Sequence, residues 1–344
     1  MPKDLQNYLS DIIKQLDTEL MLIAVNFHYV RESYDLPYKS IFGHTPKSFR
    51  SQVEKLNKLG SFVSQKQIID HLNFGKSIPS NSILLTFDDG LKEQYEIANQ
   101  ILKEMGIPAL YFVNPSNVID NKVSTVHQIH LLRSYIQTKQ MSAYVKKETG
   151  DFTLSAIEKS KAEKHYNYDE KAVAHFKYAL NFKLDYQKKA KLIQILFDNY
   201  FNNEEKSASD LYMNLEQIKS LAKSGELGSH TFNHLPLGKI NINDAKLQIT
   251  KAQDFFIKFV GSHAQAISYP YGSYESVNKK IADFARIAGL KFGFTMERVA
   301  NKELNRDPLI LGRYDCNDLP GGKNNLFKNG NIFSESKERA WVFE

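Results

Sequence analysis

Two short apolar runs on either side of a helical segment constrain the fold of this chain more than any other feature. The runs cover residues 82–87 and 108–113. Residues 91–105 between them have helical spacing, and Gly106 ends that helix. Two strands joined through a helix form a βαβ unit, and such units build parallel sheets with right-handed crossovers. The chain is therefore predicted to be an α/β protein with a parallel sheet.

The same alternation of strands and helices continues before and after this unit. A strand is predicted over 21–27, and the helix that follows, over 45–59, has Thr45 as its N-cap and Pro46 at its first position. Beyond residue 211 the chain is predicted to form a helix (215–223), a short strand to Gly228, a strand ending at Ser268, a helix (277–289), and strands at 292–295 and 309–312.

A helical insertion interrupts this alternation. Residues 116–211 have apolar side chains at helical spacing with lysines between them, for example Leu192, Ile195, Leu196 and Tyr200. Strand patterns and glycines are scarce there. We therefore predict one discontinuous α/β domain, formed by 1–115 and 212–344, with the segment 116–211 inserted into it.

Composition limits the partners. The net charge is +6, but the lysines are interleaved with acidic residues, which is typical of solvated helix faces, so no nucleic-acid partner is predicted. No apolar run is long enough to span a bilayer, whereas peripheral contact with a membrane stays open. The first 20 residues lack the layout of a signal peptide, which favours a cytoplasmic location. A single cysteine, Cys316, excludes an internal disulfide. The oligomeric state is not predicted.

Asp88 and Asp89 directly follow the predicted strand at 82–87 and precede Gly90. Two adjacent carboxylates after a buried strand are costly unless positive charge lies beside them, and a divalent metal ion would supply it. The alternative is an ordinary strand-to-helix turn in which an aspartate caps the following helix.

His230 and His234 are four residues apart in a short turn that follows Gly228. Two histidines at this spacing can converge on one metal ion, although a chain with 10 histidines can contain such a pair by accident. Together with one strand-terminal aspartate they would supply two neutral nitrogens and one carboxylate. That donor set leaves positions open for water and substrate, as in catalytic zinc sites.

These two segments carry a family resemblance. Thr86-Phe87-Asp88-Asp89-Gly90 and Ser229-His230-Thr231-Phe232-Asn233-His234 resemble the first two signature motifs of the NodB-homology polysaccharide deacetylases, carbohydrate esterase family four. Ser268-Tyr269-Pro270-Tyr271-Gly272 resembles the third motif. The resemblance covers roughly 21–115 and 212–315 and implies a distorted parallel (β/α) barrel with one divalent metal ion. One carboxylate and two imidazoles as ligands favour zinc as that ion.

The resemblance also implies a role for each matching residue. Asp89, His230 and His234 match the metal ligands, and Asp88 matches the base that activates the attacking water. Tyr271 matches the residue whose backbone N–H holds the oxyanion. The implied reaction is removal of an N-acetyl group from an amino sugar of a cell-surface polysaccharide or its precursor, which could be linked to a nucleotide or a lipid.

Two departures from the family pattern leave roles to be filled. Ser268 stands where the third motif has an arginine that orients the base, and Arg313 after a later strand is a candidate to replace it; its alternative role is a salt bridge with Asp315 or another neighbour. No histidine follows His263, so the late acid histidine is missing. His28 is the candidate replacement, by resemblance to the branch that deacetylates poly-N-acetylglucosamine. Its alternative is a structural histidine.

Two other functions stay open at this point. The departures are compatible with a catalytically weak barrel that binds carbohydrate, although both metal histidines and both aspartates are present. The same metal site could also serve an O-acetyl esterase.

Overall fold

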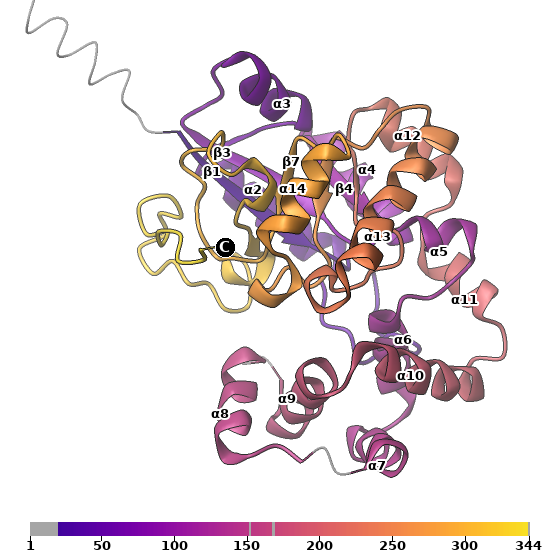
Figure 1. Ribbon diagram of the computed structural model, residues 1–344. Helices are drawn as coiled ribbons and strands as arrows, with labels where there is room; N and C mark the ends of the chain where they lie inside the picture. Colours follow the sequence, from indigo (N-terminus) through magenta and orange to yellow (C-terminus); the bar gives the residue numbers. More distant parts are fainter. Residues whose placement is uncertain (1–19, 151–152, 167–168, 343–344) are drawn as a thin grey trace, which may run out of the picture. The chain divides into compact units, whose positions relative to one another are not determined.

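The protein divides into two compact units in a computed structural model that describes residues 20–150, 153–166 and 169–342 (Figure 1). Unit 1 comprises the described residues of Met1–Val30, His44–Pro115 and Met213–Glu344. Unit 2 comprises Arg31–Gly43 and Ser116–Tyr212. The N-terminal stretch used to predict a cytoplasmic location lies outside the described residues, so that location stays a prediction.

Arg31–Gly43 belongs to unit 2, whereas we predicted it within the α/β domain. The physical reason is a pair of hydrogen bonds to helix α6 (Thr125–Tyr135). The backbone N–H of Ser40 donates to Ser134 Oγ at 3.0 Å, and the Ser40 hydroxyl donates to the carbonyl of His130. Such long-range bonds leave no local sequence pattern.

Unit 1 is built on one parallel sheet. Its strands lie in the order β7-β6-β5-β4-β3-β1-β8, and β2 also pairs with β3. The strands are β1 (Met21–Phe27), β2 (Ser61–Phe62), β3 (Asn81–Phe87), β4 (Ala109–Val113), β5 (Leu227–Ser229), β6 (Ala266–Ser268), β7 (Phe292–Phe294) and β8 (Tyr314–Asp315).

The chain after β7 closes this sheet into a barrel. Leu311 forms a parallel bridge with Phe294 in β7, and three residues later Tyr314 pairs with Val25 in β1. One short segment therefore joins both edges of the sheet. The predicted parallel α/β barrel is confirmed, and its distortion lies at this seam, where one isolated bridge replaces a ladder.

The strand predicted over 309–312 is wrong. Residues Pro308–Ile310 form a short 3₁₀-helix, η6, with Pro308 at its first position. Proline has no N–H to donate to a β-ladder and its fixed φ suits the first turn of a helix. Only Leu311 keeps a strand-like bridge to β7.

Helices of unit 1 connect the strands (Figure 1). They are α2 (Pro46–Asn57), α3 (Gln65–Phe74), the π-helical turn η1 (Gln94–Ala98) with α4 (Asn99–Met105), α12 (Leu215–Lys223), α13 (Ile242–Phe255) with η4 (Phe256–Val260), and α14 (Lys279–Ile287). Thr45 caps α2 and Pro46 begins it, and Gly106 ends α4 in the left-handed conformation, as predicted. Helices α3 and α13 were not predicted.

Unit 2 is helical, as predicted for the insertion. Its helices are the short α5 (Pro115–Ile119), which begins one residue before the unit, α6, α7 (Thr138–Thr149), α8 (Ala156–His165), α9 (Lys171–Tyr178) with η2 (Ala179–Lys183), α10 (Tyr186–Tyr200) and α11 (Glu204–Leu211). Helix α6 packs against α10. No helix in the part of the chain that the structure describes is both long and apolar enough to cross a membrane.

Alternate strand residues form the core of unit 1. Leu110 and Phe112 of β4 and Phe292 and Phe294 of β7 belong to one buried cluster, because side chains two residues apart face the same side of a strand. The ring of Phe112 lies over Gly228, where an added Cβ would be only 2.5 Å from the ring. Gly228 therefore makes room for a large side chain on the neighbouring strand.

Truncation of Phe112 tests this packing. Phe112 is fully buried, so Phe112→Ala is expected to lower the free energy of unfolding by about 3–5 kcal/mol, measured by urea denaturation. Phe74→Ala is the matched control, because Phe74 is 70% exposed. A loss as small as that of the control would contradict the assigned core.

Candidate active site

The candidate residues gather at the carboxyl ends of the strands of unit 1, where parallel α/β folds place their active sites. His28 follows β1, Asp88 and Asp89 follow β3, and His230 follows β5. Tyr271 comes three residues after β6, and Arg313 directly precedes β8. Most of these residues thus meet because their strands end at the same edge, whereas Arg313 precedes its strand and reaches Asp88 with its long side chain.

Asp89, His230 and His234 form a buried cluster that could hold a metal ion. One potential ligand atom of each residue lies within 4.8 Å of the others. Asp89 Oδ1 is 3.4 Å from His230 Nε2 and 3.2 Å from His234 Nε2. Within the described residues this is the only such group of three or more metal-binding side chains.

The tautomer of His230 fits a metal ligand. Its Nδ1–H donates to the backbone carbonyl of Ser268 at 2.7 Å, so Nε2 points toward Asp89 with its lone pair available. Burial alone would lower the pKa of His230, but the charges of Asp88 and Asp89 outweigh it, and the pKa is raised. The carboxylates thus favour a cation at this position, and a divalent metal ion fits the donor set.

The backbone around the cluster is strained. Asp89, Thr231, His234 and Tyr271 have φ values of 79°, 63°, 57° and 64°, a region that residues other than glycine seldom adopt. Such conformations cost on the order of 1–3 kcal/mol each and persist only where the surroundings hold them. Asn114 supplies part of that support, since its Nδ2 donates to the carbonyls of His230 and Thr231.

Asp88 pairs with Arg313 in the barrel interior. Arg313 Nη1 donates to Asp88 Oδ1 at 2.9 Å and Nη2 donates to Oδ2 at 2.6 Å, a bidentate pair. Burial alone would raise the pKa of Asp88, but the guanidinium of Arg313 and then the charge of His230 lower it to about 2. Asp88 is therefore ionised at neutral pH.

Arg313 also contacts Ser268, the first residue of the third motif. Its Nη2 donates to Ser268 Oγ at 2.9 Å and its Nη1 donates to Thr86 Oγ1 at 3.2 Å. The partner of this arginine is thus Asp88 rather than Asp315, the alternative that the sequence left open. Ser268 accepts from Arg313 with its hydroxyl and from His230 with its carbonyl, and so connects the two halves of the site.

His28 and Tyr271 lie beside the cluster. His28 Nε2 is 3.8 Å from Asp89 Oδ2, and the side chain is 38% exposed, so it can meet a molecule from solvent. The Tyr271 ring lies edge-on to the His234 ring, with centroids 5.0 Å apart. All seven candidate residues are therefore brought to one place.

Two supporting residues were not predicted. Asn114 directly follows β4, so the pattern that identified Asp88, a polar residue at a strand end, could have found it. Gln94 is fully buried in η1, and its Nε2 donates to the carbonyls of His28 and Asp88 at 2.9 and 2.6 Å. No local pattern indicates that glutamine, because both acceptors come from strand ends.

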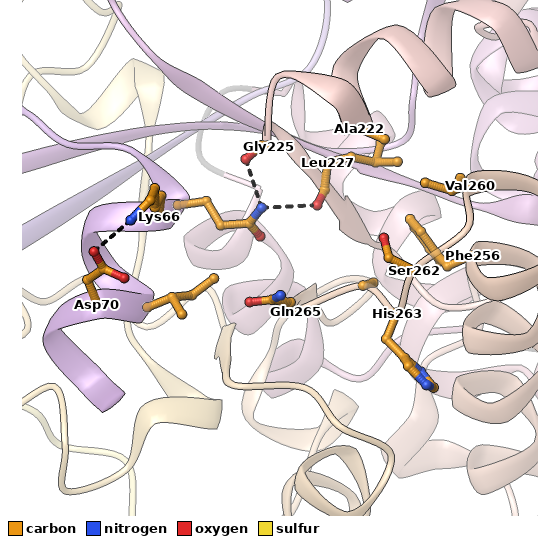
Figure 2. A pocket seen from close by; sticks show the side chains of 13 residues that line it. Lys66, Asp70, Ala222, Gly225, Leu227, Phe256, Val260, Ser262, His263 and Gln265 are labelled. Carbon is orange, nitrogen blue, oxygen red and sulfur yellow. Dashed lines mark hydrogen bonds and ion pairs between the residues drawn. The ribbon is translucent and has the colours of Figure 1, made fainter. Parts of the chain in front are cut away.

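A hollow of about 370 Å³ lies at the other end of the strands (Figure 2). It is formed by the first turns of α3 and by the segments that lead into β5 and β6, including Gly225 and Gln265. The Gln65 side chain lines this hollow, and its Nε2 donates to the carbonyls of Gly225 and Leu227. None of the candidate residues lines it, so we do not place the reaction there.

Comparison with known proteins agrees with this geometry. The model of the family described as polysaccharide deacetylase matches residues 75–150 and 185–293, more than half of the chain. The match includes Asp88, Asp89, His230, His234 and Tyr271, whereas His28 and Arg313 lie outside it. Comparison with curated protein sequences gives no match.

Solved structures share the fold. The deacetylase PplD of Streptococcus pyogenes, in complex with acetate, has a TM-score of 0.52 at 16% identity, over 86% of this chain and 92% of that one. IcaB from Ammonifex degensii has a TM-score of 0.51 at 18% identity, over 86% and 91%. The deacetylase domain of BpsB from Bordetella bronchiseptica has a TM-score of 0.50 at 16% identity, over 86% and 96%.

Metal binding tests the cluster directly. After incubation with zinc and dialysis, elemental analysis is expected to find about one ion per wild-type chain. Asp89→Asn and His230→Ala are each expected to bind the ion at least about tenfold more weakly, because each removes a donor. His263→Ala, at the hollow in Figure 2, is the matched control and keeps the ion. Equal metal content in all four proteins would show that the ligands lie elsewhere.

Proposed function

This chain belongs to the polysaccharide deacetylase family, and on that premise we propose that it removes the N-acetyl group from an amino sugar of a surface polysaccharide or of its precursor. We also propose that Asp89, His230 and His234 hold the divalent metal ion on which the reaction depends, and that this ion is zinc. One carboxylate and two imidazoles are the donors that zinc accepts in hydrolases.

One observation carries the proposal: the metal-binding cluster lies next to an ionised carboxylate that a buried arginine orients. Asp88 is the residue before the ligand Asp89, and both of its oxygens accept from Arg313. This combination suits amide hydrolysis by a metal-activated water, because the attacking water must lose a proton while the acetyl carbonyl is polarised. A divalent ion bound beside Asp88 would supply the polarisation and acidify the attacking water.

Asp88 takes the proton from that water. Its low pKa keeps it ionised but makes it a weak base, so proton transfer to Asp88 requires a strongly acidified water. Arg313 acts as a positioning residue here: its planar fork fixes the plane of the carboxylate. The remaining lone pairs of the two oxygens are available to accept the proton.

His28 and Tyr271 complete the reaction in this proposal. His28 is partly exposed beside Asp89 and gives a proton to the leaving amine nitrogen, which cannot depart as an anion. The backbone N–H of Tyr271 donates to the oxyanion that develops on the acetyl oxygen. The positive φ of Tyr271 orients that peptide group. Linkage of the substrate to a nucleotide or a lipid stays a prediction.

Replacement of Asp88 tests the base. Asp88→Asn is expected to lower acetate release from N-acetylglucosamine oligomers by about 10²–10⁴-fold, because the amide cannot accept the proton. Metal content is expected to persist, since the three ligands remain. Acetate and free amine are measured together in the wild type. Acetate release from an O-acetylated sugar but not from these oligomers would indicate an O-acetyl esterase, and release from neither substrate would favour a carbohydrate-binding barrel. Thermal unfolding of Asp88→Asn checks that the variant folds, because Arg313 loses its anionic partner.

Replacement of His28 tests the acid. His28→Ala is expected to slow deacetylation of an amide by about 10²-fold or more, and to slow hydrolysis of a phenyl acetate far less, because phenolate leaves without a proton. Rates for both substrates are compared at equal metal content. An equal loss for amide and ester would contradict the assignment, as would loss of the metal ion.

A further inference from the structure

Residues 339–342, here called the C-terminal segment, are held by a buried carboxylate. Glu297 is only 3% exposed, and its Oε1 accepts from the backbone N–H groups of Ala340 and Trp341 at 2.6 and 2.7 Å. Its Oε2 accepts from Arg339 Nε at 3.1 Å. A carboxylate is buried at little cost only when donors satisfy it, so Glu297 and this segment stabilise one another.

Glu297 places the C-terminal segment at the active-site end of the barrel. It lies three residues after β7, and its own carbonyl accepts from the backbone N–H of Arg313 at 2.8 Å. The residue before it, Met296, donates its backbone N–H to the carbonyl of Gly272, next to Tyr271, at 2.8 Å. The segment is thus fixed to the loops that carry Arg313 and Tyr271.

Trp341 of this segment meets Tyr274. Their ring centroids are 5.9 Å apart at an interplanar angle of 74°, and the Tyr274 hydroxyl donates to the carbonyl of Val342 at 2.9 Å. Tyr274 is three residues after Tyr271, so their Cα atoms are at most about 11 Å apart. Tyr274 is 47% exposed, and Trp341 is only partly buried.

Two partly exposed aromatic rings beside the proposed active site can bind a sugar ring. Aromatic rings are large, rigid and amphipathic, and the C–H faces of a pyranose ring pack against them while its hydroxyls stay in water. The bonds to Glu297 hold the backbone of Trp341, and its indole is only partly buried, so part of the ring faces solvent. The ring is thereby held in position before a sugar arrives, which limits the entropy lost on binding.

We propose that Trp341 and Tyr274 form a sugar-binding subsite beside the metal centre, which holds a neighbouring residue of the glycan chain. The proposal rests on the proposed function, because it assumes that an amino sugar reacts at Asp88. It makes the enzyme selective for oligosaccharides and polymers over a single N-acetylated sugar. The substrate is then a glycan of at least two linked sugars.

Kinetics with a monomer and a tetramer of N-acetylglucosamine test the subsite, in both β-1,4 and β-1,6 linkages. The wild type is expected to prefer one tetramer over the monomer in kcat/KM. Trp341→Ala is expected to reduce that preference about tenfold, mainly through KM for the tetramer. Trp341→Phe keeps an aromatic ring and is expected to retain most of the preference for the tetramer. Phe74→Ala, an exposed aromatic on α3, is the matched control and keeps the full preference.

Fluorescence gives a second readout that does not depend on turnover. Trp341 is the only tryptophan among the 344 residues, so its emission reports this position alone. In Asp88→Asn, which is expected to consume the probe at least about 100-fold more slowly, a tetramer is expected to shift the emission at concentrations at which the monomer does not. Tyr274→Ala is expected to weaken that response.

The outcomes separate this proposal from the proposed function. An unchanged preference in Trp341→Ala, with deacetylation intact, would overturn the subsite and leave the deacetylase standing. If the wild type released no acetate from any probe, the proposed function would fail, and the fluorescence titration would still decide the subsite. The subsite would also be overturned if no oligomer changed the fluorescence emission of Trp341.

Discussion

The buried pair of Asp88 and Arg313 is the interaction on which the rest of the site depends. Arg313 is a large, fully buried side chain, and its guanidinium donates to both oxygens of Asp88 and to the hydroxyls of Thr86 and Ser268. A buried guanidinium without these partners would cost several kcal/mol. The pair also ties β3 to the segment between β7 and β8, so the residue that orients the base also helps to hold the barrel together.

Local patterns predicted those parts of the protein that local forces determine. The strand at 21–27 and the helix at 215–223 have the predicted bounds, because a continuous apolar run and a helical repeat are readable within a few residues. Helices α3 and α13 escaped notice although each has a side-chain cap at its N-terminus. The prediction of a strand at 309–312 was wrong. Its apolar residues are buried, but Pro308–Ile310 form a 3₁₀-helix, and only Leu311 pairs with a strand.

The candidate site divides in the same way. The positions after β3 and β5 identified the two aspartates and two histidines, since motif and strand end coincide there. The partner of Arg313 could not be derived from spacing, because 225 residues separate it from Asp88. Gln94 and Glu297 were missed for a related reason. Gln94 bonds to His28, 66 residues away, and Glu297 bonds to residues 339–341, so neither contact leaves a local pattern.

The seam of the barrel gives the site a mechanical dependence. Between β7 and the closing segment the structure has one bridge, at Leu311, and Arg313 is two residues further along. Any fraying of that bridge would pull the guanidinium away from Asp88 and release the carboxylate to rotate. The orientation of the base therefore depends on the closure of the barrel at this seam.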